Sequence, residues 1–295
     1  MNILIPINNA YFGTAMIMLK SLFANNSEKI VLYVFYSELE RNKLAGLRKW
    51  VNQNDEEIKI IKIDDDSMMQ GVPVASFSKE TYFRLFAPLL LPENVHRVLY
   101  LDTDMIINGD ISECYHLDFD ENLFMAVPDT SLGIDEVKKK LNIGRDTYVN
   151  AGVLLMNLDL LRKELDLKEL LLFAKKHPDQ VQNCDQDLIN KFFHDKIGLI
   201  DWRYNYEARF HGLLDFINYP FFYLKYRKKI KVIHYMGADK PWKENYHGKF
   251  SIIFYKYTRK TILQHVAFKN ILIWPLSVLK FFLSEWMNQI FTKIS

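Results

Sequence analysis

The chain is poor in cysteine, glycine and proline. Its 295 residues include only two cysteines, Cys114 and Cys184, with 11 glycines and 9 prolines. Two cysteines so far apart make neither a disulfide framework nor a zinc-ligand pair, so we expect a reducing compartment. With 49% apolar and 14% aromatic residues, the composition excludes a disordered or collagen-like chain and predicts a sizeable core.

A charge excess of one sign and an apolar run of membrane length are also absent. The 38 basic and 36 acidic residues leave a net charge of +2, so we expect no nucleic-acid partner. The longest apolar run covers 271–283 and is interrupted by Pro275, Ser277 and Lys280, which makes it too short to span a bilayer. Residues 2–7 form a buried-strand pattern and not a signal peptide, and a cytoplasmic location is expected.

Strand and helix patterns alternate over the first hundred residues. Strand patterns occupy 3–7, 30–35, 58–63 and 97–101, and helical spacing occupies 14–23, 38–51 and 81–91. This order predicts an α/β fold with a mainly parallel central sheet between helical layers. Later patterns predict strands at 124–127, 152–156 and 231–235 and helices at 160–175 and 186–193. A basic, aromatic stretch begins near residue 250, so we expect a main domain over 1–250 and a helical tail over 251–295.

An acidic triplet, Asp102-Thr103-Asp104, directly follows the strand pattern that ends at Leu101. Ligands of α/β sheets bind at the carboxyl ends of strands. Two carboxylates one residue apart can converge there on a hard divalent cation, which is usually shared with substrate phosphates. The alternative is an ordinary turn, because Asp favours turns.

Two further polar motifs lie in the middle of the chain. In Asn150-Ala151-Gly152 the small residues let a ligand approach the backbone and the Asn can bond a sugar hydroxyl; the alternative is a strand entry with a tight bend. Asp185-Gln186-Asp187 begins a predicted helix. The two carboxylates can bind a polyol, or one of them can simply cap the helix.

Motifs near the two ends of the predicted domain offer groups for a nucleotide. His234 ends a strand pattern, Gly237 permits a tight turn, and Lys240 offers an ammonium group for phosphate. A core histidine and a solvated lysine are the alternatives.

Asn8 and Tyr11 follow the first strand, where Asn8 can bond the edge of a base and Tyr11 can stack on it. The alternative is a polar loop with a packing aromatic.

Taken together and in this order, these segments resemble glycosyltransferase family 8, which includes glycogenin and bacterial lipooligosaccharide galactosyltransferases. The resemblance spans about residues 2–245 and rests on ILIPINNAYFGTAMIMLKSL, TYFRL, VLYLDTDMII, YVNAGVLLMNL, DQDLIN and HYMGADKPW. It implies a GT-A fold and a UDP-sugar donor, UDP-glucose or UDP-galactose. It also implies a divalent metal, usually Mn²⁺ with Mg²⁺ as the alternative, and transfer of the hexose to a saccharide-bearing acceptor with retention of configuration.

The resemblance assigns roles to residues of this sequence. It implies that the metal is held by Asp102, Asp104 and His234, and the diphosphate by Lys240 and Gly237. For the rest of the donor it implies contacts from Tyr11, Arg84, Thr103, Asp129, Asn150, Ala151, Gly152 and Asp185, with Gln186 on the β-face of the reacting sugar. Two positions depart from the family pattern. Asn8 stands where the bacterial galactosyltransferases carry Asp, although its amide oxygen can still accept from uracil, and Asp239 adds a negative charge beside Lys240.

Retention leaves two candidates for the catalytic residue. A retaining hydrolase places a carboxylate nucleophile under the anomeric carbon, but the matching residue, Gln186, is a weak nucleophile. This favours front-face attack, with the leaving phosphate oxygen accepting the acceptor proton. Asp185 as nucleophile is the competing hypothesis. Two other functions stand beside transfer: a sugar-nucleotide pyrophosphorylase, which would need a Gly-rich phosphate loop after the first strand, and a non-catalytic nucleotide-sugar-binding protein.

The C-terminal stretch combines apolar helical spacing with basic residues. Apolar residues fall at positions 279, 282, 283, 286 and 290, and basic residues gather at 256–260 and 225–231. We therefore expect residues 256–295 to lie on an anionic membrane surface without crossing it. The alternative is that this stretch packs on the protein or on a second subunit.

Overall fold

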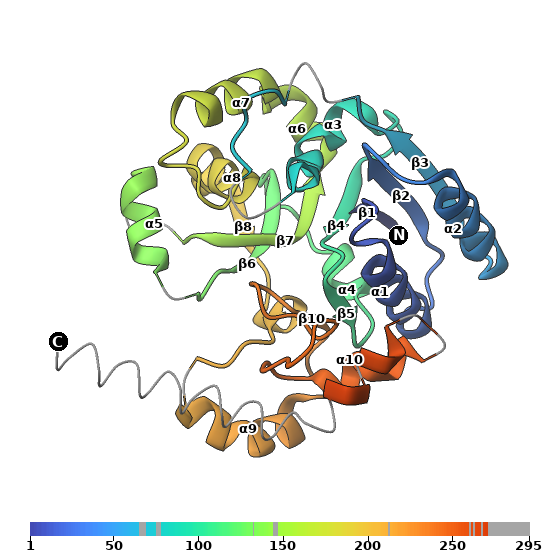
Figure 1. Cartoon of the computed structure of the whole chain (residues 1–295). Coiled ribbons are helices and arrows are strands. Elements are labelled where there is room, and N and C mark those ends of the chain that lie inside the picture. Colours follow the sequence, from blue (N-terminus) through green and yellow to red (C-terminus); the bar gives the residue numbers. More distant parts are fainter. Residues whose placement is uncertain are drawn as a thin grey trace, which may run out of the picture. The chain divides into compact units, whose positions relative to one another are not determined.

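The computed structural model describes residues 1–64, 69–74, 78–131, 133–143, 147–211, 213–259, 261, 263–266 and 268–270. The chain forms two compact units, each assembled from separate stretches of sequence. Unit 1 comprises Met1–Phe12, Ser27–Thr103 and Ile111–Tyr204, and unit 2 comprises Gly13–Asn26, Asp104–Asp110 and Asn205–Ser295. Each unit has its own sheet (Figure 1) and its own core of buried side chains.

Unit 1 is built on a mixed sheet, whose described strands lie in the order β3-β2-β1-β4-β7-β6-β8. Strands β3, β2, β1 and β4 are parallel, β7 is antiparallel to both β4 and β6, and β8 is parallel to β6. The carboxyl ends of β1 and β4 therefore share one edge of the sheet. The strand bounds are Asn2–Pro6 (β1), Val31–Tyr36 (β2), Glu57–Lys62 (β3), Arg97–Leu101 (β4), Phe124–Pro128 (β6), Val149–Asn157 (β7) and Ile197–Leu199 (β8).

Helices pack on this sheet through their apolar faces. Helix α2 contacts β3, and α8 contacts β7 (Figure 1). Apolar side chains such as Leu4, Tyr100, Phe124 and Leu154 are buried in one continuous core. The described helices of unit 1 are Arg41–Gln53 (α2), Ala87–Leu90 (α3), Ser112–Tyr115 (α4), Ile134–Leu141 (α5), Leu158–Glu164 (α6), Leu167–Lys176 (α7) and Asp185–Phe193 (α8), with 3₁₀ segments Lys79–Phe86 (η1), His194–Lys196 (η2) and Trp202–Tyr204 (η3).

Two predicted helices differ from the structure. The segment predicted as a helix at 81–91 is the 3₁₀ segment η1 followed by α3. The single helix predicted at 160–175 is wrong, because α6 ends at Glu164 and α7 begins at Leu167. Between them Asp166 is extended, and its carboxylate accepts from the Glu169 backbone N–H at 3.0 Å. An N-cap of this kind begins a new helix inside a continuous apolar pattern.

Strand β7 is longer than predicted and contains the small residues of the Asn150-Ala151-Gly152 motif. Its pairing with β6 is irregular: Ala126 pairs with Leu154, whereas the next residue, Val127, pairs with Asn150. The residues of β7 between Asn150 and Leu154 therefore bulge out of the ladder with β6. The motif lies within a bulged strand and not at a bend before the strand. The bulge takes the Ala151 backbone out of the ladder with β6, so side chains can hydrogen-bond to it.

Unit 2 contains a small sheet in the order β5-β10-β9, formed by Met105–Ile107, Val232–His234 and Tyr206–Glu207. Strand β10 is antiparallel to β5 and parallel to β9. The described helices of this unit are α1 (Phe12–Asn25), α9 (Leu213–Tyr226) and α10 (Ser251–Thr258). Helix α1 belongs to the unit from Gly13 onward. The core of the unit is largely aromatic and includes the buried rings of Tyr235, Tyr246, Phe250 and Phe254.

The predicted tail over 251–295 begins with α10, whose Phe254 and Tyr257 are buried in the aromatic core of unit 2. The start of this stretch therefore packs on the protein. Residues 271–295, which include the predicted tail helix, lie outside the described residues. No helix in the described part of the chain combines the length and the apolar character needed to cross a bilayer.

Candidate functional site

In unit 1, Arg84 joins two of the predicted site carboxylates. The Arg84 Nε lies 2.7 Å from Asp185 Oδ2, and its Nη2 lies 3.3 Å from Asp102 Oδ1. The guanidinium also donates to the Ala151 carbonyl and lies over the Tyr100 ring, 4.1 Å from its centroid. A buried guanidinium is tolerated when it is paired and hydrogen-bonded in this way. The structure thus brings together four predicted residues: Arg84, Asp102, Ala151 and Asp185.

The two carboxylates of the Asp185-Gln186-Asp187 motif have different surroundings. Asp185 is 1% exposed, and its burial, opposed by Arg84, raises the pKa of the carboxyl to about 7. Asp187 is also buried, and it accepts from the backbone N–H groups of Gln182 at 2.7 Å and Asn183 at 2.6 Å. Asp187 therefore holds the loop that precedes α8 and is not an N-cap, since the N-cap position of α8 is Cys184 and has no side-chain hydrogen bond. Asp185 instead faces Arg84.

Gln186 belongs to a network that fixes both ends of its amide. Its Oε1 accepts from the Ala151 backbone N–H at 3.0 Å, and its Nε2 donates to Asp129 Oδ2 and to the Tyr148 hydroxyl, both at 3.1 Å. Asn150 Nδ2 also donates to Asp129 Oδ2, at 3.3 Å. The structure thus brings Asp129, Asn150 and Gln186 together around the bulge of β7.

Asn8 and Tyr11 lie in the loop that follows β1. The Asn8 Oδ1 accepts from the Tyr11 backbone N–H at 2.9 Å, and its Nδ2 donates to Glu80 Oε2 at 3.1 Å. The buried Glu80 also accepts from the Ser37 hydroxyl at 2.9 Å. An amide oxygen has two lone pairs, so Asn8 can accept from a base as well. The Tyr11 residue is 36% exposed, which leaves its ring accessible for stacking.

In unit 2, Asp104 lies between His234 and Lys240. Its Oδ1 is 3.1 Å from His234 Nε2, and its Oδ2 is 2.6 Å from Lys240 Nζ, which also donates to the Tyr235 carbonyl at 2.6 Å. Burial raises the pKa of the Asp104 carboxyl, but Lys240 and His234 outweigh burial and hold that pKa well below its ordinary value. Asp104 is therefore an anion at neutral pH. Lys240 is buried, so the alternative of a solvated lysine is wrong.

Asn205 sets the position of the proton on the His234 imidazole. The His234 Nδ1 lies 2.9 Å from Asn205 Oδ1, an acceptor, so in the neutral ring Nδ1 carries the proton. The Nε2 lone pair then points toward Asp104 Oδ1, 3.1 Å away. Two acceptors that face each other need a proton or a cation. An outer hydrogen bond on the other ring nitrogen is also typical of metal-ligating histidines, so this donor set fits a metal ion.

The described residues include a group of three side chains that can supply ligands to one ion, namely Asp102, Asp104 and His234. A single buried residue, Thr103, separates Asp102 from Asp104 along the chain. Two carboxylates and an imidazole form a mixed oxygen and nitrogen donor set. Carboxylate oxygens are preferred ligands of Mg²⁺ and Mn²⁺.

The turn between His234 and Lys240 requires glycine. Gly237 has a φ of +81°, in the left-handed region that favours glycine, and a Cβ at this position would lie 3.3 Å from Arg209 Nη1. The neighbouring Asp239 accepts from the His247 backbone N–H at 2.8 Å and lies 3.6 Å from the His247 imidazole. Asp239 is therefore engaged by His247, while the Lys240 ammonium pairs with Asp104.

Several polar residues of these groups are absent from the sequence-based prediction. The Tyr100 hydroxyl donates to Asp102 Oδ1 at 2.7 Å, and the Tyr148 hydroxyl donates to Asp187 Oδ1 at 2.6 Å. Both tyrosines adjoin a predicted motif, which is a local signal. Glu80 is 72 residues from Asn8, and Asn205 is 29 residues from His234. The sequence gives no local sign of either of these contacts.

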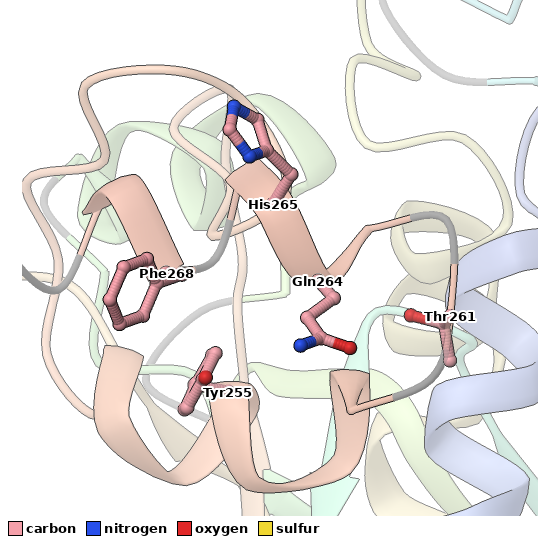
Figure 2. A pocket seen from close by; sticks show the side chains of 5 residues that line it. All are labelled: Tyr255, Thr261, Gln264, His265 and Phe268. Atoms are coloured by element: carbon pink, nitrogen blue, oxygen red, sulfur yellow. The ribbon is translucent and has the colours of Figure 1, made fainter.

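A separate pocket of about 420 Å³ lies near the end of the described chain in unit 2 (Figure 2). The rings of Tyr255 and Phe268, whose centroids are 5.8 Å apart, form part of its lining. The other lining residues are Thr261, Gln264 and His265. None of these five is a predicted site residue, so this pocket is distinct from the groups described above.

Comparison with known proteins identifies the class to which this fold and these groups belong. The family model described as Glycosyl transferase family 8 matches residues 2–246. The chain therefore belongs to glycosyl transferase family 8, as its motifs predict.

Sequence relatives include bacterial glycosyltransferases. The lipopolysaccharide 1,3-galactosyltransferase of Salmonella typhimurium is 27% identical over 79% of this chain and 70% of its own length. Glycosyltransferase GlyE of Streptococcus pneumoniae is 24% identical over 84% of this chain, and general stress protein A of Bacillus subtilis is 25% identical over 77%. The alignments cover 58% of GlyE and 82% of the Bacillus protein, so this chain spans little more than half the length of GlyE.

Solved structures establish the fold. The galactosyltransferase LgtC, crystallised with donor and acceptor sugar analogs, superposes with a TM-score of 0.75 at 22% identity, covering 89% of this chain and 96% of LgtC. The crystal structure of GlyE gives a TM-score of 0.66 at 20% identity, covering 90% of this chain and 62% of that chain. The predicted GT-A fold, an α/β fold with a mostly parallel central sheet, is confirmed.

Proposed function

We propose that the protein is a retaining glycosyltransferase that moves glucose or galactose from its UDP-sugar to a saccharide-bearing acceptor, a glycan, glycolipid or glycoprotein. The observation that carries the proposal is the Asp104 group of unit 2. A half-buried, ionised carboxylate lies between an imidazole oriented by Asn205 and a lysine ammonium, and a second carboxylate, Asp102, stands two positions earlier in the sequence. Membership of family 8 supports the same reaction class.

In this proposal Asp102, Asp104 and His234 would hold a divalent ion, Mn²⁺ or Mg²⁺, and Lys240 would pair with the donor diphosphate. Such an ion stabilises negative charge that develops on a leaving phosphate. Lys240 supplies a fixed ammonium for the same charge. The left-handed turn at Gly237 positions the loop that carries Lys240.

The remaining donor contacts are assigned to residues of the family motifs. Tyr11 stacks on uracil, and the Asn8 amide oxygen accepts from the uracil N3–H. Arg84, Asp129, Asn150 and Asp185 bind the sugar together with the Ala151-Gly152 backbone, next to Thr103. The pairing of Arg84 with Asp185 and the bonding of Asn150 to Asp129 support this role, because these side chains are held in place before a ligand arrives.

Retention is proposed to occur by attack on the front face of the sugar. The bond between the anomeric carbon and the phosphate oxygen breaks, the acceptor oxygen bonds to the anomeric carbon, and the acceptor proton passes to the leaving phosphate oxygen. The fixed Gln186 amide, with its oxygen on the Ala151 N–H, supports a role in positioning. Asp185 is disfavoured as a nucleophile, since it is buried and a pKa of about 7 leaves part of it protonated at neutral pH.

A cytoplasmic location at the inner face of the membrane completes the proposal. Basic residues of the 256–260 cluster, together with the apolar spacing beyond residue 279, would hold the protein on anionic lipid near a lipid-linked acceptor. Lys256 and Arg259 lie at the end of α10, and Lys256 contacts the Tyr257 ring at 4.9 Å. The rest of the segment lies largely outside the described residues.

The deciding experiment measures UDP release and sugar transfer with UDP-glucose and UDP-galactose, each with Mn²⁺, with Mg²⁺ and with chelator. We expect metal-dependent turnover of one donor, its loss in Asp104→Asn, and an α linkage by proton NMR. Asp55→Asn is the matched control, because Asp55 is an exposed carboxylate that should tolerate the change. Donor binding without turnover would favour the non-catalytic alternative, and a β-linked product would refute retention.

A further inference from the structure

Helix α9 exposes a continuous apolar stripe. The residues Leu214, Ile217, Phe221 and Leu224 are 75%, 56%, 76% and 70% exposed. Their spacing of three, four and three residues places them on one face, within about 80° of each other around the helix axis. Single exposed apolar residues are ordinary, but a row of four on one helix face marks an interaction surface.

The opposite face of α9 is anchored in unit 2, so the stripe is exposed on a firmly packed helix. The Tyr219 hydroxyl, on the buried face, accepts from the Phe250 backbone N–H at 2.8 Å. Phe222, Tyr223 and Tyr226 pack against the same aromatic core. The helix therefore has two apolar faces, of which one packs against the core and the other is exposed.

A basic cluster continues from the end of this stripe. Lys225, Arg227, Lys228 and Lys229 are all exposed. Lys225 and Lys229 lie 4.9 Å and 5.7 Å from the centroid of the Tyr226 ring. Within the described part of the chain, none of the four forms an ion pair with a carboxylate.

The acidic residue of α9 does not offset this charge. Asp215 lies near the start of the helix, and its carboxylate pairs with the buried Lys249 at 2.7 Å. The surface formed by the stripe and the cluster is therefore apolar along the helix and cationic at its C-terminal end.

We propose that α9 and the 225–229 cluster form a docking surface for an anionic lipid bilayer, with Ile217, Phe221 and Leu224 entering the interface and the basic side chains on lipid headgroups. Charge complementarity selects this occupant. A second copy of the chain, packed through the same stripe, would bury the apolar side chains but bring no free carboxylate of α9 to the basic cluster, because Asp215 is paired with Lys249. An anionic bilayer accepts both the apolar stripe and the cations. The inference rests on the membrane-surface location proposed above and gives it a defined structural element.

The test compares binding of the full chain to phosphatidylcholine vesicles with and without phosphatidylserine, measured by co-sedimentation at low and high salt. We expect binding that needs phosphatidylserine and weakens with salt. The triple variant Ile217→Ser, Phe221→Ser, Leu224→Ser should bind at least about tenfold more weakly. The control Leu89→Ser, Leu172→Ser, which changes residues that are 60% and 50% exposed in unit 1, should bind as the parent does.

The charge half of the surface is tested with Lys225→Gln, Lys228→Gln, Lys229→Gln. Each lost cation should weaken binding to anionic vesicles about fivefold, the equivalent of about 1 kcal/mol. Sugar transfer to a soluble acceptor should be unchanged in every variant of this surface. If the parent protein transfers no sugar, the proposed reaction is refuted, and the vesicle-binding test of α9 can still be carried out.

Three outcomes would overturn the inference. If the parent ignores anionic vesicles at low salt, both α9 docking and the membrane location fail. If the parent binds and the stripe and charge variants bind equally well, α9 is not the docking element, although the tail can still be. If the stripe variant instead lowers the unfolding midpoint, or dissociates a dimer seen by sedimentation in the absence of lipid, the stripe is covered by this chain or by a second copy.

Discussion

The buried Tyr148 hydroxyl connects the Gln186 amide to a buried carboxylate. It donates to Asp187 Oδ1 at 2.6 Å and accepts from Gln186 Nε2 at 3.1 Å. The change Tyr148→Phe removes this oxygen while keeping the ring, which is 2% exposed. We expect the variant to have a lower free energy of unfolding, because Asp187 loses a hydrogen bond. We also expect its Gln186 side chain to be held less firmly.

The two losses differ in size. The Asp187 carboxylate is fully buried and keeps its backbone donors at Gln182 and Asn183, so it loses one hydrogen bond to a charged group, about 1.5–3 kcal/mol of unfolding free energy. Gln186 loses one neutral acceptor and keeps Asp129. That loss is about 0.5–1.5 kcal/mol, at most about tenfold in kcat.

Burial raises the pKa of Asp187, and the Tyr148 hydroxyl lowers it. Losing the hydroxyl raises that pKa further above its unfolded value. A raised pKa in the folded state means a contribution to stability that is lost as pH rises. The stability deficit of Tyr148→Phe should therefore grow as pH increases through the pKa of Asp187.

Urea unfolding followed by circular dichroism, at several pH values, measures the stability term, and steady-state kinetics measures kcat. The matched control is Tyr82→Phe, because the buried Tyr82 hydroxyl donates at 2.7 Å to a neutral group, the Pro73 carbonyl. That change should cost only about 0.5–1.5 kcal/mol and leave kcat unaltered. Equal costs for the two variants at every pH, with unchanged kcat in both, would refute the reasoning.

Three further predictions concern other contacts. Removing the outer hydrogen bond on His234 with Asn205→Ala should weaken Mn²⁺ binding in the presence of UDP about 10- to 100-fold by calorimetry; unchanged affinity would count against the ligand role of His234. Because the pKa of Asp185 is raised from 3.8 to about 7, the unfolding free energy of the parent minus that of Asp185→Asn should fall as pH rises between these values, and a rise would contradict the burial argument. Asp166→Ala, which deletes the cap on the Glu169 N–H, should lower the unfolding free energy by about 1 kcal/mol in thermal melts, whereas an unchanged melting temperature would show that α7 needs no cap.

Local patterns sufficed for much of the first unit. The buried runs that form β1, β2 and β4 stand out because each is short and apolar, and those of β1 and β2 are followed by a helical pattern. The break between α6 and α7 also has a local sign, since Asp166 and Glu169 form an N-terminal capping pattern within the predicted helix. Apolar periodicity alone conceals such a break, because the helices on both sides bury the same kind of residue.

The candidate site divides in the same way. Asp102 and Asp104 follow a strand end and were expected to act together. What the sequence could not predict is how side chains distant along the chain meet, as Asn205 meets His234 and Glu80 meets Asn8. Such contacts depend on which strands and loops become neighbours in the fold, and that order has no local signature.

The interleaved chain path of unit 2 has a consequence for synthesis. Helix α1 and strand β5 emerge early from the ribosome, but their partners come much later: Ile106 pairs with Ile233, and Asn25 donates to the Tyr257 hydroxyl across 232 residues. Until the aromatic residues within 206–257 have been made, Ile17 and Ile106 lack the aromatic core that buries them. Unit 2 is therefore expected to complete folding only after this stretch has been translated, and the waiting apolar segments are natural substrates for chaperones.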